Sequence, residues 1–138
     1  VLFYEDTHSN KSINDMATDL KNKFKPQKQS VDSHIFTQST FWYKFKINNP
    51  NNSSLQRYIV FDLPWLDEVN IFIDDKTNQR SIYHTGNTLP FKQRSYKTNL
   101  LNIKHDFEKG ISTVFIQVNG KAPFVLPISI LDEKEFLI

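Results

Sequence analysis

The chain has 138 residues, of which 38% are hydrophobic and 14% aromatic, and its 17 basic and 15 acidic residues leave a formal net charge of +2. This length suits a single domain over residues 1–138, and twelve Phe, five Tyr and two Trp are enough to build a buried core. The balanced charge excludes a dedicated nucleic-acid binder, which needs clustered cations to displace counterions. The lack of cysteine excludes disulfide bonds and thiolate metal sites.

The two ends of the chain indicate that it is part of a larger protein. The first residue is Val1 rather than Met, and the last residues, 136–138, are apolar. No stretch approaches the roughly 18 apolar residues that cross a bilayer. We therefore expect a domain cut from a larger protein, with a signal peptide and any membrane segments lying outside this sequence.

One helix is predicted near the start of the chain. Ser12 and Asp15 resemble a capping box, with Asp in place of the usual Glu. The apolar residues that follow are spaced to form one helical stripe: Ile13, Met16, Ala17, Leu20 and Phe24. Pro26 closes the segment, so the helix is predicted over residues 13–24.

The rest of the chain reads as short β-strands. The strongest candidates alternate, or are rich in β-branched and aromatic residues: 41–47, 57–63, 69–73, 111–118 and 124–131. Weaker candidates are 2–4, 34–37, 81–84 and 96–103, and turn-forming clusters lie at 48–54, 74–78 and 119–121. Because no second helix separates the strands, we expect a mainly β sandwich or barrel of antiparallel strands.

The alternation also assigns faces to the strands. One face is apolar throughout, with side chains such as Tyr43, Ile59, Ile71 and Ile116, while single aromatic rings occupy the opposite face: Trp42, Tyr58, Phe72 and Phe115. Such rings among polar neighbours could stack on sugar rings, with Lys44 among the groups that bond the hydroxyls. The alternative, which we favour, is that the amphipathic helix covers this outer face, since an exposed apolar stripe must be buried somewhere.

Recognisable catalytic motifs do not appear in the sequence. The four histidines, His8, His34, His84 and His105, form no metal-binding motif, and there is neither a nucleophile elbow nor a Gly-rich phosphate loop. Asp74, Asp75 and Asn78 could be considered for calcium, but their spacing does not fit the known loop, and an acidic hairpin turn is the simpler interpretation. We therefore expect no enzyme activity and no cofactor.

Several segments, taken in order, resemble a known family. They are Phe3–Asp6, the strand at 41–49 (FWYKFKINN), 59–62 (IVFD), 64–72 (PWLDEVNIF), 85–94 (TGNTLPFKQR), 113–118 (TVFIQV) and 126–130 (LPISI). Their order and spacing resemble the second type of extracellular domain in bacterial seven-transmembrane receptors with diverse intracellular signalling modules (7TMR-DISM). The resemblance covers nearly the whole chain.

This resemblance implies a fold, a location and a function. The fold would be a jelly-roll-like antiparallel β-sandwich, similar to carbohydrate-binding modules. The location would be the periplasm, as part of an inner-membrane protein with an output such as a diguanylate cyclase or histidine kinase outside this chain. The function would be non-catalytic sensing of a carbohydrate or other small molecule, by analogy only. The alternative is a periplasmic protein-interaction or homodimerisation module.

Two further residues complete the candidate ligand site of Trp65, Arg94, Tyr58, Phe72, Lys44 and His84. Trp65 follows Pro64 and is either an exposed stacking platform or a plug at the end of the sandwich. Arg94 lies at the end of the segment 85–94 that resembles the family, and its guanidinium group could bind a carboxylate or sugar hydroxyls with two parallel hydrogen bonds. We favour a structural role for Arg94, in which it anchors a long loop to backbone carbonyls or to Asp62.

Overall fold

The computed structural model describes residues 2–6, 11–18, 24–26, 40–61, 68–85, 101–119 and 128–132. The described elements are one helix and nine strands: β1 (Leu2–Asp6), α1 (Ile13–Ala17), β2 (Lys25–Pro26), β3 (Thr40–Asn49), β4 (Leu55–Phe61), β5 (Glu68–Asp74), β6 (Arg80–Thr85), β7 (Leu101–Phe107), β8 (Gly110–Asn119) and β9 (Ile128–Leu131). The prediction of a mainly β chain with one short helix near its start is confirmed.

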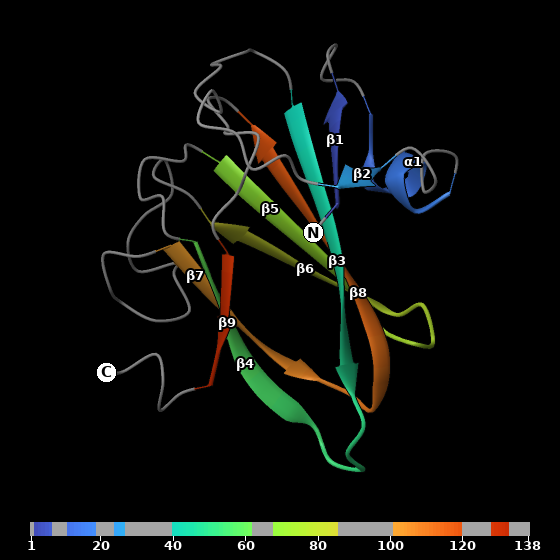
Figure 1. Ribbon diagram of the computed structural model, residues 1–138, viewed down its shortest axis with the longest axis vertical. Helices are drawn as coiled ribbons and strands as arrows, with labels where there is room; N and C mark the ends of the chain where they lie inside the picture. Colours follow the sequence, from blue (N-terminus) through green and yellow to red (C-terminus); the bar gives the residue numbers. More distant parts are fainter. Residues whose placement is uncertain are drawn as a thin grey trace.

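The strands form two antiparallel sheets. The larger sheet has the order β2-β1-β3-β8-β5-β6, and the smaller has the order β7-β4-β9. In Figure 1 the three-stranded sheet lies on one side of the six-stranded sheet, and α1 lies on the other side, next to the short edge strand β2. The long strands β3 and β8 pair along their length, with Phe41 opposite Val118 at one end and Asn49 opposite Gly110 at the other. In the strand order they lie at the centre of the larger sheet.

The main core lies between the two sheets. It contains buried side chains from both: Phe41, Tyr43, Ile59, Phe61, Val69, Ile71, Ile73, Ile103, Phe107, Val114, Ile116 and Val118. Because side chains alternate between the faces of a strand, every second residue of β3, β4, β5 and β8 points into this layer. The inner faces predicted from the alternation are confirmed.

The predicted helix is correct at its start and wrong at its end. Ser12 and Asp15 form the capping box, in which the Asp15 amide donates to Ser12 Oγ at 3.4 Å and the Ser12 amide donates to Asp15 Oδ2 at 2.8 Å. The helix ends at Ala17, however, and Phe24 lies outside it. Residues 19–23, including Leu20, lie outside the described residues. Lys25 and Pro26 pair with β1 instead, so sheet pairing overrides the helical spacing at Phe24.

The predicted strands are found wherever the structure describes their residues, with changed boundaries. The strands near 2–4, 41–47, 57–63, 69–73, 81–84 and 111–118 correspond to β1, β3, β4, β5, β6 and β8. The predictions at 34–37, 96–100 and 124–127 lie outside the described residues. The sequence reading missed the second half of β7, Lys104–Phe107, where charged residues and a histidine weaken the β signal.

A buried asparagine organises the turn between β3 and β4. Asn49 is 0% exposed, and its Nδ2 donates to the Phe107 carbonyl at 3.0 Å and to the Ser53 carbonyl at 2.9 Å. Its Oδ1 accepts from the Asn51 amide at 3.0 Å. The predicted loop at 48–54 is therefore shorter than expected, because β3 continues to Asn49 before the chain turns.

Removing the Asn49 side chain should destabilise the domain. Asn49→Ala leaves a buried carbonyl at Phe107 without this donor, so we expect a loss of about 1–3 kcal/mol in the free energy of unfolding. Urea denaturation measures it. The control is Asn52→Ala in the same turn, which is exposed and should stay within about 0.5 kcal/mol of the parent. Equal effects of the two substitutions would contradict this role for Asn49.

One strand offers a matched test of the core. Ile116 is 0% exposed and Ile111 is 53% exposed, and both lie on β8. Ile116→Ala should cost about 2–5 kcal/mol through lost burial and the cavity left behind. Ile111→Ala should cost less than about 0.5 kcal/mol. Equal costs in chemical denaturation would show that the inner face of β8 is not the core.

Candidate ligand-binding surfaces

The outer face of the six-stranded sheet carries an aromatic patch made by Trp42, Phe72 and Phe115. Trp42 and Phe72 stack, with ring centroids 5.9 Å apart and an interplanar angle of 26°. Met16 of α1 and Phe24 are buried against this patch, and the Phe24 and Phe115 rings are 6.2 Å apart. The favoured interpretation, in which the amphipathic helix covers these outer rings, therefore holds for Met16, whereas Phe24 covers the patch from outside the helix.

Lys44 lies at the border of the aromatic patch. Its Nζ is 5.6 Å from the ring centroid of Phe24 and 5.6 Å from that of Phe115. A cation over an aromatic face is attracted by the ring quadrupole. Lys44 therefore helps to hold Phe24 on the sheet while its side chain stays only half-buried.

The Trp42 indole is buried, and the described residues offer its ring N–H no acceptor. The side chain is 0% exposed, and Nε1 has no hydrogen-bond partner among the described residues. A buried donor without an acceptor costs roughly 1–3 kcal/mol. The ring contacts with Phe72 and the cover of Met16 and Phe24 must outweigh this cost for the indole to stay where it is.

Polar side chains from four strands cross the same face at one end of the sheet. His84 on β6, Asn70 on β5 and Gln117 on β8 are neighbours in the strand register. Asn70 Oδ1 is hydrogen-bonded to His84 Nδ1, and Asn70 Nδ2 donates to Gln117 Oε1 at 2.8 Å. The central amide of Asn70 thus connects an imidazole with a second amide.

The line continues at the ends of the strands. Asn70 Nδ2 also donates to Glu68 Oε1 at 3.1 Å, and the same oxygen accepts from Asn119 Nδ2 at 3.3 Å. Thr40 Oγ1 donates to Asn119 Oδ1 at 2.9 Å. We call these six residues, His84, Asn70, Gln117, Glu68, Asn119 and Thr40, the polar row. His84 and Glu68 are exposed, so the row is accessible from solvent.

The structure brings together three of the six predicted site residues. Lys44, Phe72 and His84 all lie on the outer face of the six-stranded sheet. Tyr58 lies on β4 of the other sheet and is only 4% exposed. Trp65 and Arg94, together with the proposed Arg94 partner Asp62, lie outside the described residues.

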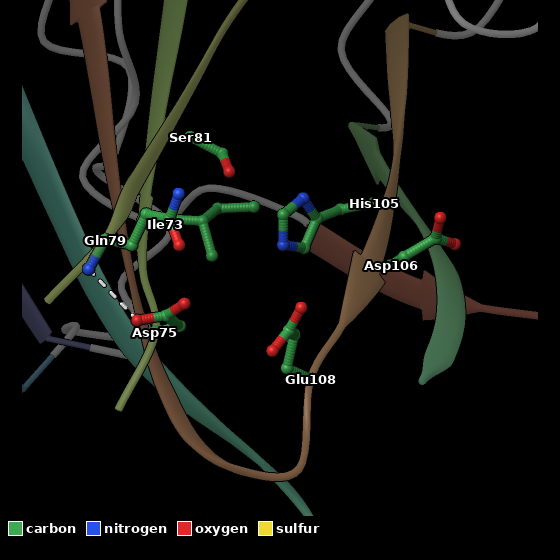
Figure 2. Close-up of a pocket in the computed structure, with 7 residues that line it drawn as sticks. All are labelled: Ile73, Asp75, Gln79, Ser81, His105, Asp106 and Glu108. Carbon is green, nitrogen blue, oxygen red and sulfur yellow. Dashed lines mark hydrogen bonds between the residues drawn. The ribbon is translucent and has the colours of Figure 1, made fainter. Parts of the chain in front are cut away.

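A second feature, which the sequence reading missed, is a pocket at the edge where the two sheets meet. Its volume is about 180 Å³, and Figure 2 shows the residues that line it: Ile73, Asp75, Gln79, Ser81, His105, Asp106 and Glu108. The first four come from the β5–β6 hairpin and the last three from β7 and the turn after it. Residues so far apart in the chain give no local motif, so their spacing could not have revealed the pocket.

His105 is the central side chain of this pocket. Its Nδ1 is 2.6 Å from the hydroxyl of Tyr83, and its ring meets Phe107 edge-on with centroids 4.7 Å apart. Burial lowers the pKa of the His105 imidazole, although the charges of Asp106, Asp75 and Glu108 act in the opposite direction. Burial also raises the pKa of the Tyr83 hydroxyl, and the charge of Asp106 adds to this effect.

The acidic hairpin turn at 74–78 is held by its own side chains. Asp75 Oδ1 accepts from the Thr77 amide at 2.8 Å, from Thr77 Oγ1 at 2.6 Å and from the Gln79 amide at 3.0 Å. Asp74 forms a two-pronged ion pair with Arg80, with Oδ1 2.6 Å from Nε. Within the described part of the chain, no group of three His, Asp or Glu side chains is placed to hold a metal ion.

The fold defines the class of this protein as a two-sheet antiparallel β domain. The chain belongs to the 7TMR-DISM extracellular 2 family, whose model matches residues 1–132. It is thus an extracellular sensor domain of a membrane-anchored receptor, in a family that is non-catalytic in general. No curated protein matches the sequence. Among the described helices, none has the length and apolar character needed to cross a bilayer.

Trp42 should report on the cover of the aromatic patch. In a Trp65→Phe background Trp42 is the only tryptophan, and its full burial predicts weak quenching of its fluorescence by acrylamide. Phe24→Ala removes part of the cover and should increase that quenching. The control is Leu2→Ala, an exposed apolar residue on β1 that is not among the residues of the patch. Unchanged quenching in Phe24→Ala would show that Phe24 does not shield Trp42.

Proposed function

We propose that the chain is a non-catalytic, periplasmic ligand-binding sensor domain of a bacterial signal-transduction receptor, and that its ligand is a hydroxyl-rich small molecule, with carbohydrates the favoured class. The observation that supports this proposal is the polar row, which lines up an imidazole, three amides, a carboxylate and a hydroxyl across four strands. These groups lie on a rigid sheet rather than on separate loops.

The chemistry of the row suits a polyol. A sugar hydroxyl both donates and accepts a hydrogen bond, so it pairs best with groups that offer both, such as amides and imidazole. His84 uses Nδ1 within the row, and no hydrogen bond from the described residues engages its second ring nitrogen, which we propose for a ligand. Side chains already held by their neighbours lose little conformational freedom on binding, which favours affinity.

The neighbouring residues supply the other elements of a sugar site. Lys44 and Phe72 share the outer face with the row, so a ligand on the row would lie near a cation and an aromatic edge. Glu68 and Thr85 both lie at the end of the sheet that carries the row. In the sequence, Trp65 comes three residues before Glu68, and Arg94 comes nine residues after Thr85. We propose that Trp65 and Arg94 complete the site from there.

The jelly-roll topology is part of the same proposal. Apart from the β5–β6 hairpin, consecutive strands from β3 onward alternate between the six-stranded and the three-stranded sheet. This alternation is typical of jelly-roll sandwiches, and it supports the likeness to carbohydrate-binding modules without assigning a ligand. Signalling would follow if the ligand stabilises one arrangement of the receptor over another.

A thermal-shift screen of the domain tests the proposal. The probes are neutral sugars, sugar acids, amino acids and peptidoglycan fragments. A compound that binds only the folded state stabilises it by about 2.7 kcal/mol at a hundredfold excess over its dissociation constant. We expect a sugar to raise the Tm of the parent and of Ile111→Ala, which changes an exposed residue on the same face but far from the row.

His84→Ala and Gln117→Ala should lose the sugar-dependent rise in Tm, because each removes hydrogen-bonding groups of the row. A rise that survives both substitutions would place the site elsewhere. If the whole library leaves the Tm unchanged, the carbohydrate proposal fails. Concentration-dependent growth in particle size by light scattering would then favour a periplasmic protein partner or a homodimer.

A further inference from the structure

The pocket around His105 lies between the two sheets at their edge. Tyr83 belongs to β6, the outermost strand of the six-stranded sheet, and His105 belongs to β7 of the three-stranded sheet. The 2.6 Å hydrogen bond between the Tyr83 hydroxyl and His105 Nδ1 therefore connects the two sheets, and the two rings meet edge-on at 84° with centroids 5.6 Å apart. A change in the charge of His105 acts directly on this connection.

The charges that face His105 come from several elements. Asp75 faces it from the β5–β6 turn, and Asp106 and Glu108 come from β7 and the turn after it (Figure 2). On β4, Arg57 is the register partner of His105, and its Nη1 donates to the Gln56 carbonyl at 2.7 Å. The other groups around the pocket come from β5, β6 and the turn between them, and they are uncharged at neutral pH: Tyr83, Ser81, Gln79 and Ile73.

The two ring nitrogens of His105 have different surroundings. Nδ1 is committed to Tyr83, so Nε2 is the atom left to face the pocket. Figure 2 shows the ring pointing into the space in which the carboxylates of Asp75 and Glu108 lie. Protonation makes both nitrogens donors, so Nδ1–H then donates to the Tyr83 oxygen and Nε2–H seeks an acceptor. The nearest anionic candidates belong to the pocket itself.

We propose that His105 is a proton-operated latch between the two sheets: when it is protonated, Glu108 and Asp75 move towards its Nε2–H, the pocket contracts, and the β5–β6 hairpin is held against β7. Of the two carboxylates that lie towards the ring in Figure 2, Asp75 and Glu108, Glu108 is the freer to move. Its side chain is exposed, and no hydrogen bond or ion pair within the described part of the chain engages it. Asp75, in contrast, already holds the turn through Oδ1.

Thermodynamic linkage gives the direction of this change. In the open pocket, burial keeps the pKa of His105 below its ordinary value, so this arrangement disfavours the proton. A contracted pocket, with carboxylates close to the ring, would favour the proton instead. Lowering the pH through this range therefore shifts the population towards the contracted arrangement, because a bound proton stabilises the state that holds it more tightly. This latch is separate from the polar row and does not depend on the proposed sugar ligand.

Nuclear magnetic resonance of the ligand-free domain tests the latch. The imidazole signals of the four histidines are followed from pH 8 to pH 5, and His105→Gln assigns the signal of His105. We expect His105 to titrate below pH 6.5, and the backbone amide signals of Gln79 and Ser81 to move with the same midpoint. Those two residues lie across the pocket, Ser81 on β6 of the other sheet and Gln79 in the turn before it, so their movement reports contraction rather than local protonation.

Two matched substitutions separate the latch from a general charge effect. Glu108→Gln removes the mobile carboxylate and should lower the His105 midpoint by roughly half a pH unit, as expected for one partly solvated charge pair, and reduce the movement of Gln79 and Ser81. Lys46→Gln changes the net charge by one unit at an exposed site on β3, on the outer face of the six-stranded sheet, and should change neither. Titration of His105 without movement of Gln79 and Ser81, or an unchanged midpoint in Glu108→Gln, would overturn the latch. Both results leave the sugar proposal untouched.

Discussion

The central strands of the six-stranded sheet carry large apolar side chains on both faces, so both faces must be removed from water. On the inner face, β3, β5 and β8 present residues such as Tyr43, Ile71 and Ile116, which the three-stranded sheet covers. On the outer face, the same strands present the aromatic patch, which Met16 and Phe24 cover. Burial of apolar area is the dominant favourable term in folding, and here it requires a layer on each side of one sheet.

The limits of these two layers determine where solvent reaches the sheet. The cover made by Met16 and Phe24 lies over the aromatic patch, and the polar row crosses the same face beside it. At the edge formed by β6 and β7, the apolar core gives way to Tyr83, His105 and the carboxylates of the pocket. Each candidate surface therefore lies where a packed layer ends, which is where polar groups can be held rigidly and still meet a ligand or a proton.

The differences between expectation and structure have particular physical causes. The capping box of Ser12 and Asp15 is a contact over three residues, so the start of α1 could be predicted from the sequence. The end of α1 could not, because Lys25 and Pro26 pair with β1, and the spacing of Phe24 does not reveal that partner. Among the predicted site residues, Lys44, Phe72 and His84 share one face, because they occupy alternate positions on paired strands. Tyr58 has the same local pattern, but it lies on the other sheet.

By itself, the sequence determined most of the described strands and which side of them is apolar, since alternation with a period of two is a property of the local chain. Its ordered segments also determined the family. Only the tertiary structure decided that Phe24 covers the aromatic patch, that Asn70 lies between His84 and Gln117, and that His105 meets Tyr83. These contacts depend on strand order and register, which are set by packing between residues far apart in the chain, and no local pattern encodes that choice.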